Sequence, residues 1–497
     1  METTIASIET EHKALINQVL NFENSIHINR PATLKDGIKK INKRARRRYV
    51  KKFKKRAIEK KLCNFIPASG SGSRMFKEVI SFCKNYNVAE ESFSLYVNRT
   101  KDYKLKDFLI HLKKFPFYNY IPQTILHPEH DYSSNDKKKL SIAKYLIEEA
   151  KIHCQPKALQ MFHQFDNNIS NTALQSQYFF HQLLASAFGE YDMHLTINEN
   201  FKNEFSSELS NYIKDNFPVS FSVQSKETDA YCLNNYNNMF TTNSGDFLKK
   251  PAGHGALIEN LDAIKADCLY LHNIDNIPHP HTHEKLAKES KVALGFLSFL
   301  EEKIHKYLTL LEKGKLDKQN YKRFKKFCKN HLHIDFKSHL QNSSEGKMST
   351  IYHLLNRPIR VCAMVPDTNQ KGGGPFWVNE TDGTTSLQIV ESVEMNSDWD
   401  IQVEQQPTHF NPVAVYCSLK NYKGEPFNLF HFSKEERKFL VHKSYNGKDI
   451  KYFESAGLWN GAMHNWTTMF IEMKGKYFNP VKSIVDVLNN GHIKGSK

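Results

Sequence analysis

The sequence predicts an α/β fold. Short apolar runs bounded by polar residues alternate with longer amphipathic patterns, and this alternation is typical of strands joined by helices in a parallel sheet. The clearest strand patterns are His194–Ile197, Val219–Val223 and Cys268–His272. An amphipathic pattern from about Glu284 to Lys313 predicts a long helix.

Length and composition are those of a globular protein of more than one domain. The chain has 497 residues, of which 40% are hydrophobic and 25% charged, so two or three domains are expected. No apolar run approaches the ~18 residues of a membrane span, and no signal peptide is recognisable at the N-terminus. The eight cysteines include no CxxC pair. A cytoplasmic protein without a membrane span is therefore expected.

Residues 1–61 are predicted to form a basic helical N-terminal extension. Between Lys39 and Lys61, 14 of the 23 residues are lysine or arginine, in a chain whose net charge is +16. Apolar residues recur there at every fourth position and form one stripe of a helix: Ile41, Ala45, Tyr49, Phe53 and Ala57.

This basic helix has two interpretations. It can pack its apolar stripe on the catalytic domain with the cations facing water, or its cationic face can bind RNA or an anionic membrane surface. The sequence contains neither zinc-ligand spacing nor an aromatic RNA-binding strand. We therefore favour packing and do not expect a nucleic acid as partner.

A glycine-rich turn follows the next predicted strand, Leu62–Pro67, and precedes a helix predicted from about Arg74 to Lys84. Small residues let backbone N–H groups approach a phosphate, and an arginine can bind it with two hydrogen bonds. The turn is neither a Walker A loop nor a dinucleotide fingerprint, and it could be only a tight connection. The candidate phosphate-binding residues are Ser69, Gly70, Ser71, Gly72, Ser73 and Arg74.

A lone acid, Asp275, follows the predicted strand Cys268–His272. A buried strand presents such a carboxylate at the carboxyl edge of the sheet, where open α/β folds bind ligands, and its oxygens can hold a divalent metal. The alternative is a helix cap. Nearby, His254 lies between two glycines and either lines a ligand or holds a turn. The histidines of His279–His283 are expected to be incidental, because two prolines oppose a ladder strand there.

Residues 351–497 are rich in strand-like runs, glycine and tryptophan. Glu391, His409 and Asn411 lie in the part expected to close over a substrate, where polar groups would contact hydroxyls. Trp377 and Trp459 either stack on a sugar or pack within the domain, and we favour packing.

Six short motifs follow one another between residues 62 and 488. They are Ser69–Arg74, Pro156–Lys157, Gln224–Ser225, Pro251–Gly255, Asn273–Asn276 and Phe478–Lys482. Motifs of these types in this order resemble those of the UTP–sugar-1-phosphate uridylyltransferases, also called UDP-sugar pyrophosphorylases. The whole chain resembles a bacterial family of unknown function (DUF4301-like) that is itself similar to these enzymes.

The resemblance implies a GT-A-like doubly wound mixed sheet, of the nucleotide-diphospho-sugar transferase type, with a helical N-terminal extension and a C-terminal α+β region. A nucleotidyltransferase-like core would occupy residues 62–350, with an insertion at about 85–150. Residues 351–497 would complete the substrate site.

The activity that the resemblance implies is Mg²⁺-dependent transfer of a nucleotidyl group, uridylyl in these enzymes, from a nucleoside triphosphate to a sugar 1-phosphate or a similar phosphorylated molecule. Arg74 would neutralise the β- and γ-phosphates, Lys157 the α-phosphate and Lys482 the sugar phosphate. Asp275 would bind Mg²⁺. Further contacts are implied to the nucleotide for Gln224, Gly253, His254 and Gly255, and to the substrate for Asn273.

Two departures keep alternatives open. Lys157 lies about eighty residues after the glycine-rich turn, much farther than in the better-known enzymes, so that Lys77 competes for its role. Ala252 stands where those enzymes have a glycine, which puts uracil recognition in question. Because the loop around Gly70 is altered and Lys157 is displaced, the alternative is a nucleotide- or nucleotide-sugar-binding protein of the same fold with weak or no catalysis. A second alternative, based on the basic residues 39–61, is an RNA- or membrane-surface-binding protein.

Overall fold

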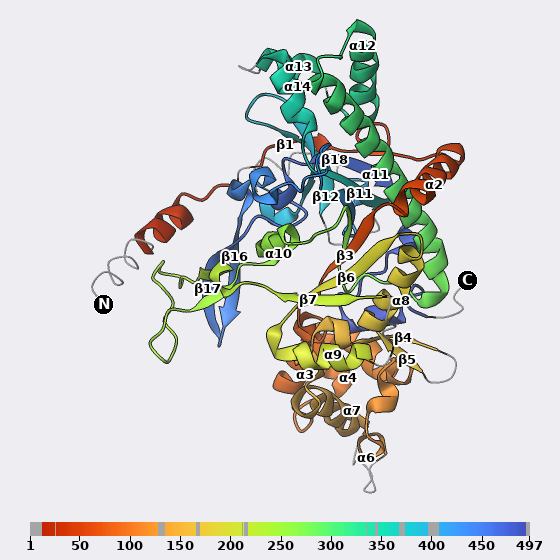
Figure 1. Ribbon diagram of the computed structural model, residues 1–497. Coiled ribbons are helices and arrows are strands. Elements are labelled where there is room, and N and C mark those ends of the chain that lie inside the picture. The colour runs from red at the N-terminus through yellow and green to blue at the C-terminus, as the bar shows by residue number, and fades with distance from the viewer. Residues whose placement is uncertain are drawn as a thin grey trace. The chain divides into compact units, whose positions relative to one another are not determined.

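The computed structural model describes residues 12–24, 26–127, 135–165, 169–210, 212, 217–334, 336–342, 346–366, 373–395 and 407–493. These residues form an α/β protein with a mixed, mostly parallel central sheet (Figure 1), which confirms the predicted fold class. The hydrogen-bonded order of its strands is β2 (Ile38–Lys39), β18 (Thr467–Glu472), β11 (Ile359–Pro366), β15 (Ala414–Ser418), β10 (Cys268–His272), β3 (Lys61–Pro67), β6 (Glu190–Ile197) and β7 (Val219–Val223). Within the described ranges no helix is both long and apolar enough to cross a membrane.

The chain divides into two compact units, each assembled from three segments. The first unit comprises residues 1–63, 223–271 and 292–473, and the second comprises residues 64–222, 272–291 and 474–497.

Strand β11 is the centre of the first unit, and its residues from Ile359 to Val365 are buried. It pairs in parallel with β18, which pairs in parallel with β2, and it pairs antiparallel with β15 and β14 (His409–Phe410). Further strands form smaller antiparallel sheets: β1 (Ile28–Pro31) with β12 (Gly374–Asn379) and β13 (Thr385–Val390), β8 (Asp229–Tyr231) with β9 (Lys249–Pro251), and β16 (Phe439–Tyr445) with β17 (Lys448–Glu454).

The helices of the first unit include the basic helix α2, which lies against α11 (Figure 1). Asn42 caps α2 by accepting a hydrogen bond of 2.9 Å from the Ala45 N–H. The bounds are α2 (Lys43–Ala57), α10 (Ile258–Asp262), α11 (His283–Glu312), α12 (Lys318–Phe327), α13 (Phe336–Asn342) and α14 (Lys347–Leu355); α11 begins within the second unit.

The apolar stripe of α2 packs as predicted. Tyr49, Phe53 and Ala57 are buried, and the Tyr49 ring lies 5.2 Å from the ring of Phe296. The helix backbones approach closely at Gly295, where a Cβ atom would overlap the carbonyl oxygen of Tyr49. The glycine is therefore required for the contact between α2 and α11.

The second unit is rich in helices. Their bounds are α3 (Lys77–Asn85), α4 (Phe93–Thr100), α5 (Tyr103–Ile110), α6 (Gln123–Leu126), α7 (Asn135–Lys144), α8 (Ala173–Ala185) and α9 (Lys202–Ser210). Strands β4 (Met161–Gln164) and β5 (Ser170–Thr172) pair beside α8, which begins with a capping box formed by Thr172 and Gln175. The aromatic rings of Phe82 and Phe93 meet between α3 and α4 at 5.5 Å.

The prediction that residues 1–61 are helical is wrong for residues 28–39. Residues Ile28–Pro31 form β1, which pairs antiparallel with β12, and Ile38–Lys39 form β2. The partner of β1 lies more than three hundred residues away along the chain, so the local sequence pattern contains no sign of the pairing.

Gly295→Ala should lower the free energy of unfolding by about 1–3 kcal/mol, because the added methyl group would force α2 away from α11. Helix propensity alone predicts the opposite, a gain of about 1 kcal/mol. Urea unfolding followed by circular dichroism measures the difference. Lys306→Ala, at an exposed position of the same helix, is the control and should change stability by no more than ~0.5 kcal/mol. A Gly295→Ala protein as stable as the parent would contradict the packing.

Candidate active site

The glycine-rich turn pairs with a segment that is distant in the sequence. It follows β3 and leads through a single 3₁₀ turn, Gly72–Arg74, to α3. The Gly72 N–H donates to the Gln155 carbonyl at 2.9 Å, and the Lys157 N–H donates to the Gly70 carbonyl at 3.0 Å. Both segments belong to the second unit. Backbone pairing therefore brings Lys157 beside the turn.

Lys157 points its side chain at the end of β10. Its Nζ donates to Asp275 Oδ2 at 2.9 Å and to the Val481 carbonyl at 3.0 Å. Lys77, the competing lysine, begins α3 and is exposed. Of the two candidates, Lys157 is thus the one that meets the predicted metal ligand.

The last described segment of the chain closes the same site. The Val481 N–H donates to the Asp275 carbonyl at 3.0 Å, and Lys482 Nζ donates to Asp275 Oδ2 at 3.0 Å. The Ile484 N–H donates to the Met75 carbonyl at 3.0 Å, so this segment also contacts the residue that follows the glycine-rich turn. We call Lys157, Asp275 and Lys482 the Lys–Asp–Lys cluster.

Asp275 is the buried anion of this cluster. Burial by itself raises the pKa of its carboxyl, but the charges and hydrogen bonds of Lys482 and Lys157 outweigh burial and hold the pKa below its usual value. Its Oδ1 is buried and accepts no hydrogen bond from the described residues. Asp275 caps no helix, because it lies in the turn after β10. One carboxylate oxygen thus binds two ammonium groups, while the other has no hydrogen-bond donor among the described residues.

The exposed side of the glycine-rich turn is open. A Cβ atom on Gly70 would meet no described protein atom within 4 Å, so packing does not require a glycine there. Ser71 Oγ and Ser73 Oγ lie 2.9 Å apart, and Ser73 Oγ donates to the His153 carbonyl at 3.2 Å. Arg74 is exposed, and among the described residues it has no hydrogen-bonding partner. A polyphosphate could approach the backbone here closely.

The predicted base-binding loop lies in the first unit, where it has structural contacts. His254 stacks on Trp459 with ring centroids 4.0 Å apart, and its Nδ1 accepts the Leu458 N–H at 2.9 Å. Burial lowers the pKa of His254 to about 4, against the opposing charges of nearby glutamates. A Cβ atom on Gly255 would overlap the Ala456 carbonyl oxygen. The alternative that His254 holds a turn is confirmed, and contact with a base stays a prediction for Gly253, His254 and Gly255.

The other predicted ligand residues bond within the protein. Gln224 donates to Thr228 Oγ1 at 3.0 Å, and Glu391 accepts the Trp459 indole N–H at 3.2 Å. Asn411 Nδ2 donates to the Ala363 carbonyl, and His409 Nδ1 lies 2.8 Å from Thr408 Oγ1. The Asn273 carbonyl accepts from Gln177. Substrate contacts of these residues stay predictions. Trp459 is buried and stacks on His254, so its predicted packing is confirmed. Trp377 is also buried but lines a cavity, so its burial does not decide between packing and stacking on a ligand.

Sequence reasoning missed two features near the cluster. One is the Val481 carbonyl, which accepts a hydrogen bond from Lys157 Nζ; a backbone acceptor leaves no signal in the sequence. The other is a buried contact between His163 Nε2 and His492 Nδ1 at 3.0 Å. The histidines of His279–His283 make both local and distant contacts: His283 Nε2 lies 3.0 Å from the Pro278 carbonyl oxygen, and the His279 N–H donates to the Gly491 carbonyl at 2.7 Å.

Comparison with known proteins places the chain in a family. A family described as a domain of unknown function, DUF4301, matches residues 2–493. The chain belongs to the DUF4301 family. No curated protein sequence matches this DUF4301 chain.

Among solved structures, the DUF4301 chain is similar to the uridine diphosphate N-acetylglucosamine pyrophosphorylase of Trypanosoma brucei, with 12% identity and a TM-score of 0.46 over 93% of this chain and 72% of that one. It is also similar to the UDP-glucose pyrophosphorylase of Leishmania major, with 10% identity and a TM-score of 0.41 over 96% of this chain and 73% of that one.

Asp275→Asn should destabilise the protein at neutral pH by about 1–3 kcal/mol, because two ammonium groups lose their buried anion. The folded protein lowers the pKa of Asp275, so the carboxylate stabilises the fold above its unfolded pKa of about 3.9, and this contribution is lost as the pH falls through the folded pKa. The difference in the free energy of unfolding between the parent and Asp275→Asn should therefore become smaller as the pH is lowered. Urea midpoints at several pH values measure it.

Asp36→Asn is the matched control for that experiment. Asp36 pairs with Arg30 at 2.7 Å in an exposed ion pair, which is worth about 0–1 kcal/mol. Equal losses of stability in the two variants at neutral pH would show that the Lys–Asp–Lys cluster contributes no more than a surface pair.

Proposed function

We propose that the protein is a Mg²⁺-dependent nucleotidyltransferase that transfers a nucleotidyl group, uridylyl in the first instance, to a sugar 1-phosphate or a similar phosphorylated small molecule. The observation that carries the proposal is the Lys–Asp–Lys cluster beside the open glycine-rich turn. Two ammonium groups placed on one carboxylate, next to small exposed residues and the free Arg74, suit a polyphosphate ligand.

In this reaction a phosphate oxygen of the acceptor attacks the α-phosphorus of the nucleoside triphosphate. A phosphorus–oxygen bond forms as the bond to the bridging oxygen breaks, and pyrophosphate leaves with the electron pair. The transfer mainly needs alignment and neutralisation of charge. In the proposal Arg74 binds the β- and γ-phosphates, Lys157 the α-phosphate, and Lys482 the acceptor phosphate.

Asp275 restrains both lysines before any ligand binds. The side chain of Lys157 is 13% exposed and that of Lys482 is 53% exposed, so Lys157 is the more enclosed cation and Lys482 the one that faces solvent. Cations whose positions are set in advance need little reorganisation when charge develops on the phosphates.

The residues present fit a magnesium ion. Asp275 Oδ1 is a hard oxygen ligand without a hydrogen-bond donor among the described residues. The described residues contain no group of three or more histidine, cysteine, aspartate or glutamate side chains that could hold a metal. Mg²⁺ commonly takes one or two carboxylates together with substrate phosphates and water. When bound, the ion would neutralise phosphate charge beside the two lysines.

A second candidate is a nucleotide- or nucleotide-sugar-binding protein of weak or no catalysis. The observation that favours it is that both lysine ammonium groups already share Asp275 Oδ2, which reduces the positive charge they offer to a phosphate. Both candidates predict nucleotide binding, but only the first predicts turnover.

Turnover should depend on Lys157 and not on Lys77. A panel of nucleoside triphosphates and sugar 1-phosphates with Mg²⁺ should show pyrophosphate release with at least one pair. Lys157→Gln and Arg74→Ala should each reduce that turnover by at least ~10²-fold, the scale of losing one transition-state donor. Lys77→Gln is the matched control and should leave turnover unchanged. Nucleotide binding without pyrophosphate release would favour the second candidate, and unchanged turnover in folded Lys157→Gln protein would rule out the proposed role.

Gly70→Ala separates ligand binding from folding. The methyl group would meet no described protein atom, so stability should be unchanged or higher by up to about 1 kcal/mol. Triphosphate affinity, measured by calorimetry, should fall by at least ~10-fold, because the ligand could no longer approach the backbone. Gly255→Ala is the contrasting control, since it should destabilise the fold. Parental affinity in Gly70→Ala protein would remove the turn from the phosphate site.

A further inference from the structure

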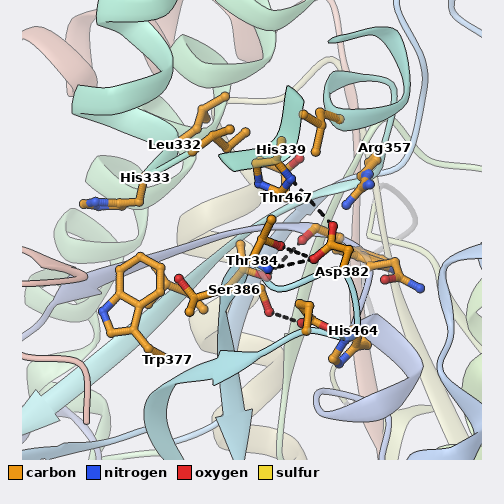
Figure 2. A pocket seen from close by; sticks show the side chains of 18 of the residues that line it. Leu332, His333, His339, Arg357, Trp377, Asp382, Thr384, Ser386, His464 and Thr467 are labelled. Carbon is orange, nitrogen blue, oxygen red and sulfur yellow. Dashed lines mark hydrogen bonds and ion pairs between the residues drawn. The ribbon is translucent and has the colours of Figure 1, made fainter. Parts of the chain in front are cut away.

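A cavity of about 280 Å³ lies within the first unit, between the turn that joins β12 to β13 and the end of α14 (Figure 2). All of its lining residues belong to the first unit, whereas the Lys–Asp–Lys cluster belongs to the second. Its volume is near the lower end of the ~300–1,000 Å³ of small-molecule sites, so its ligand would be about the size of a monosaccharide.

Arg357 supplies the positive charge of the cavity. Its Nε donates to the His353 carbonyl at 2.7 Å, which orients the guanidinium. Its two terminal nitrogens have no hydrogen-bond acceptor among the described residues. Burial lowers the pKa of Arg357 and outweighs the opposing charges of Glu380 and Asp382, but an arginine stays protonated at neutral pH. A guanidinium whose two terminal nitrogens are free to donate can bind a carboxylate or a phosphate with two parallel hydrogen bonds.

Glu380 and Asp382 face the same cavity from the turn between β12 and β13, and both are held in place. Glu380 accepts from Ser386 Oγ at 2.5 Å and from His464 Nε2 at 3.0 Å. Asp382 Oδ1 accepts from the N–H and hydroxyl of Thr384 at 2.9 and 2.6 Å.

The Glu380 carboxylate is suited to accept hydrogen bonds. Burial alone would raise the pKa of Glu380, but hydrogen bonds from His464 and Ser386 and the charge of Lys434 lower it to about 2. Ionised carboxylates accept hydrogen bonds from hydroxyl groups, and they repel a ligand of high negative charge.

Four residues that line the cavity have a buried polar side-chain atom without a partner among the described residues: His333, Trp377, Trp466 and Thr467. Thr467 is 7% exposed and its Oγ1 is unpaired, and Trp466 is 4% exposed with an unpaired indole N–H. A buried polar group without a partner is unfavourable. Figure 2 shows Thr467 among the side chains that surround this space, together with Arg357 and Asp382. A ligand hydroxyl in the cavity would satisfy Thr467.

We propose that this cavity binds a small polyhydroxylated molecule that carries one carboxylate or phosphate group. The anionic group binds the Arg357 guanidinium, and the hydroxyls bind the carboxylates of Glu380 and Asp382 and the hydroxyl of Thr467. Trp377 supplies an apolar wall. The mixture of one cation with two carboxylates selects against triphosphates and against purely apolar ligands. The inference is independent of the proposed transferase activity.

Calorimetric titration of the full chain tests the inference. Glucuronate and glucose 6-phosphate are the probes, and they distinguish a carboxylate from a phosphate as the anionic group. At least one of them should bind with a Kd below ~1 mM, and glucose and inorganic phosphate, which each lack one half of the required chemistry, should bind at least ~10-fold more weakly. Absence of binding by both probes at ~10 mM, well above that Kd, would overturn the proposal.

Two variants locate the binding. Thr467→Val removes only an unpaired hydroxyl, so the melting temperature should be unchanged or higher, while affinity for the bound probe should fall by ~3- to 10-fold. Arg357→Lys keeps the positive charge but loses the two parallel N–H donors of the guanidinium, and it should lower the affinity for the probe by at least ~10-fold. Thr350→Val is the matched control: this buried threonine donates to the Gly346 carbonyl at 3.3 Å outside the cavity, so its loss should cost stability and leave affinity unchanged.

Lys482→Gln separates the cavity from the proposed active site. Probe affinity should be the same in Lys482→Gln protein as in the parent, because Lys482 does not line the cavity. Loss of affinity in this variant with full affinity in Thr467→Val and Arg357→Lys would assign the probe to the Lys–Asp–Lys cluster and overturn the proposal. Loss of nucleotide turnover with retained probe binding would leave the cavity assignment standing alone.

Discussion

The Asp275 carboxylate joins stretches of the second unit that are far apart in the sequence. Its Oδ2 accepts from Lys157 and from Lys482, which lie 118 and 207 residues away along the chain. Its backbone carbonyl accepts the Val481 N–H. Bringing two ammonium groups together is unfavourable unless an anion compensates their repulsion, so the position of this one side chain decides whether the cations can lie together beside the glycine-rich turn.

Local sequence patterns predicted several elements with bounds close to those observed. The strands Val219–Val223 and Cys268–His272 have the predicted bounds, and α11 begins and ends within one residue of its prediction. The second of these strands ends at His272, and Asp275 lies in the turn that follows. An apolar run followed by a lone acid was therefore enough to locate the carboxylate of the Lys–Asp–Lys cluster.

Sequence patterns could not predict features that depend on distant partners. Spacing along the chain left Lys77 in competition with Lys157, but backbone pairing of Gly72 with Gln155 brings the distant lysine to the turn. Nor could the sequence separate two kinds of glycine. A Cβ atom on Gly255 would overlap the Ala456 carbonyl oxygen, whereas a Cβ atom on Gly70 would meet no described protein atom within 4 Å. Both are small residues in a loop, and only their surroundings distinguish packing from access for a ligand.

The contact between Lys157 and the Val481 carbonyl spans 324 residues, and this separation has a consequence for biosynthesis. During translation the Lys157 and Asp275 side chains leave the ribosome long before Lys482 does, and contacts of such high sequence separation form slowly because the chain entropy of closing the loop is lost first. Until the last segment of the second unit has emerged, Asp275 can neutralise only one of its two lysines. A nascent chain would therefore complete the Lys–Asp–Lys cluster only after the segment around Lys482 has been synthesised and has left the ribosome.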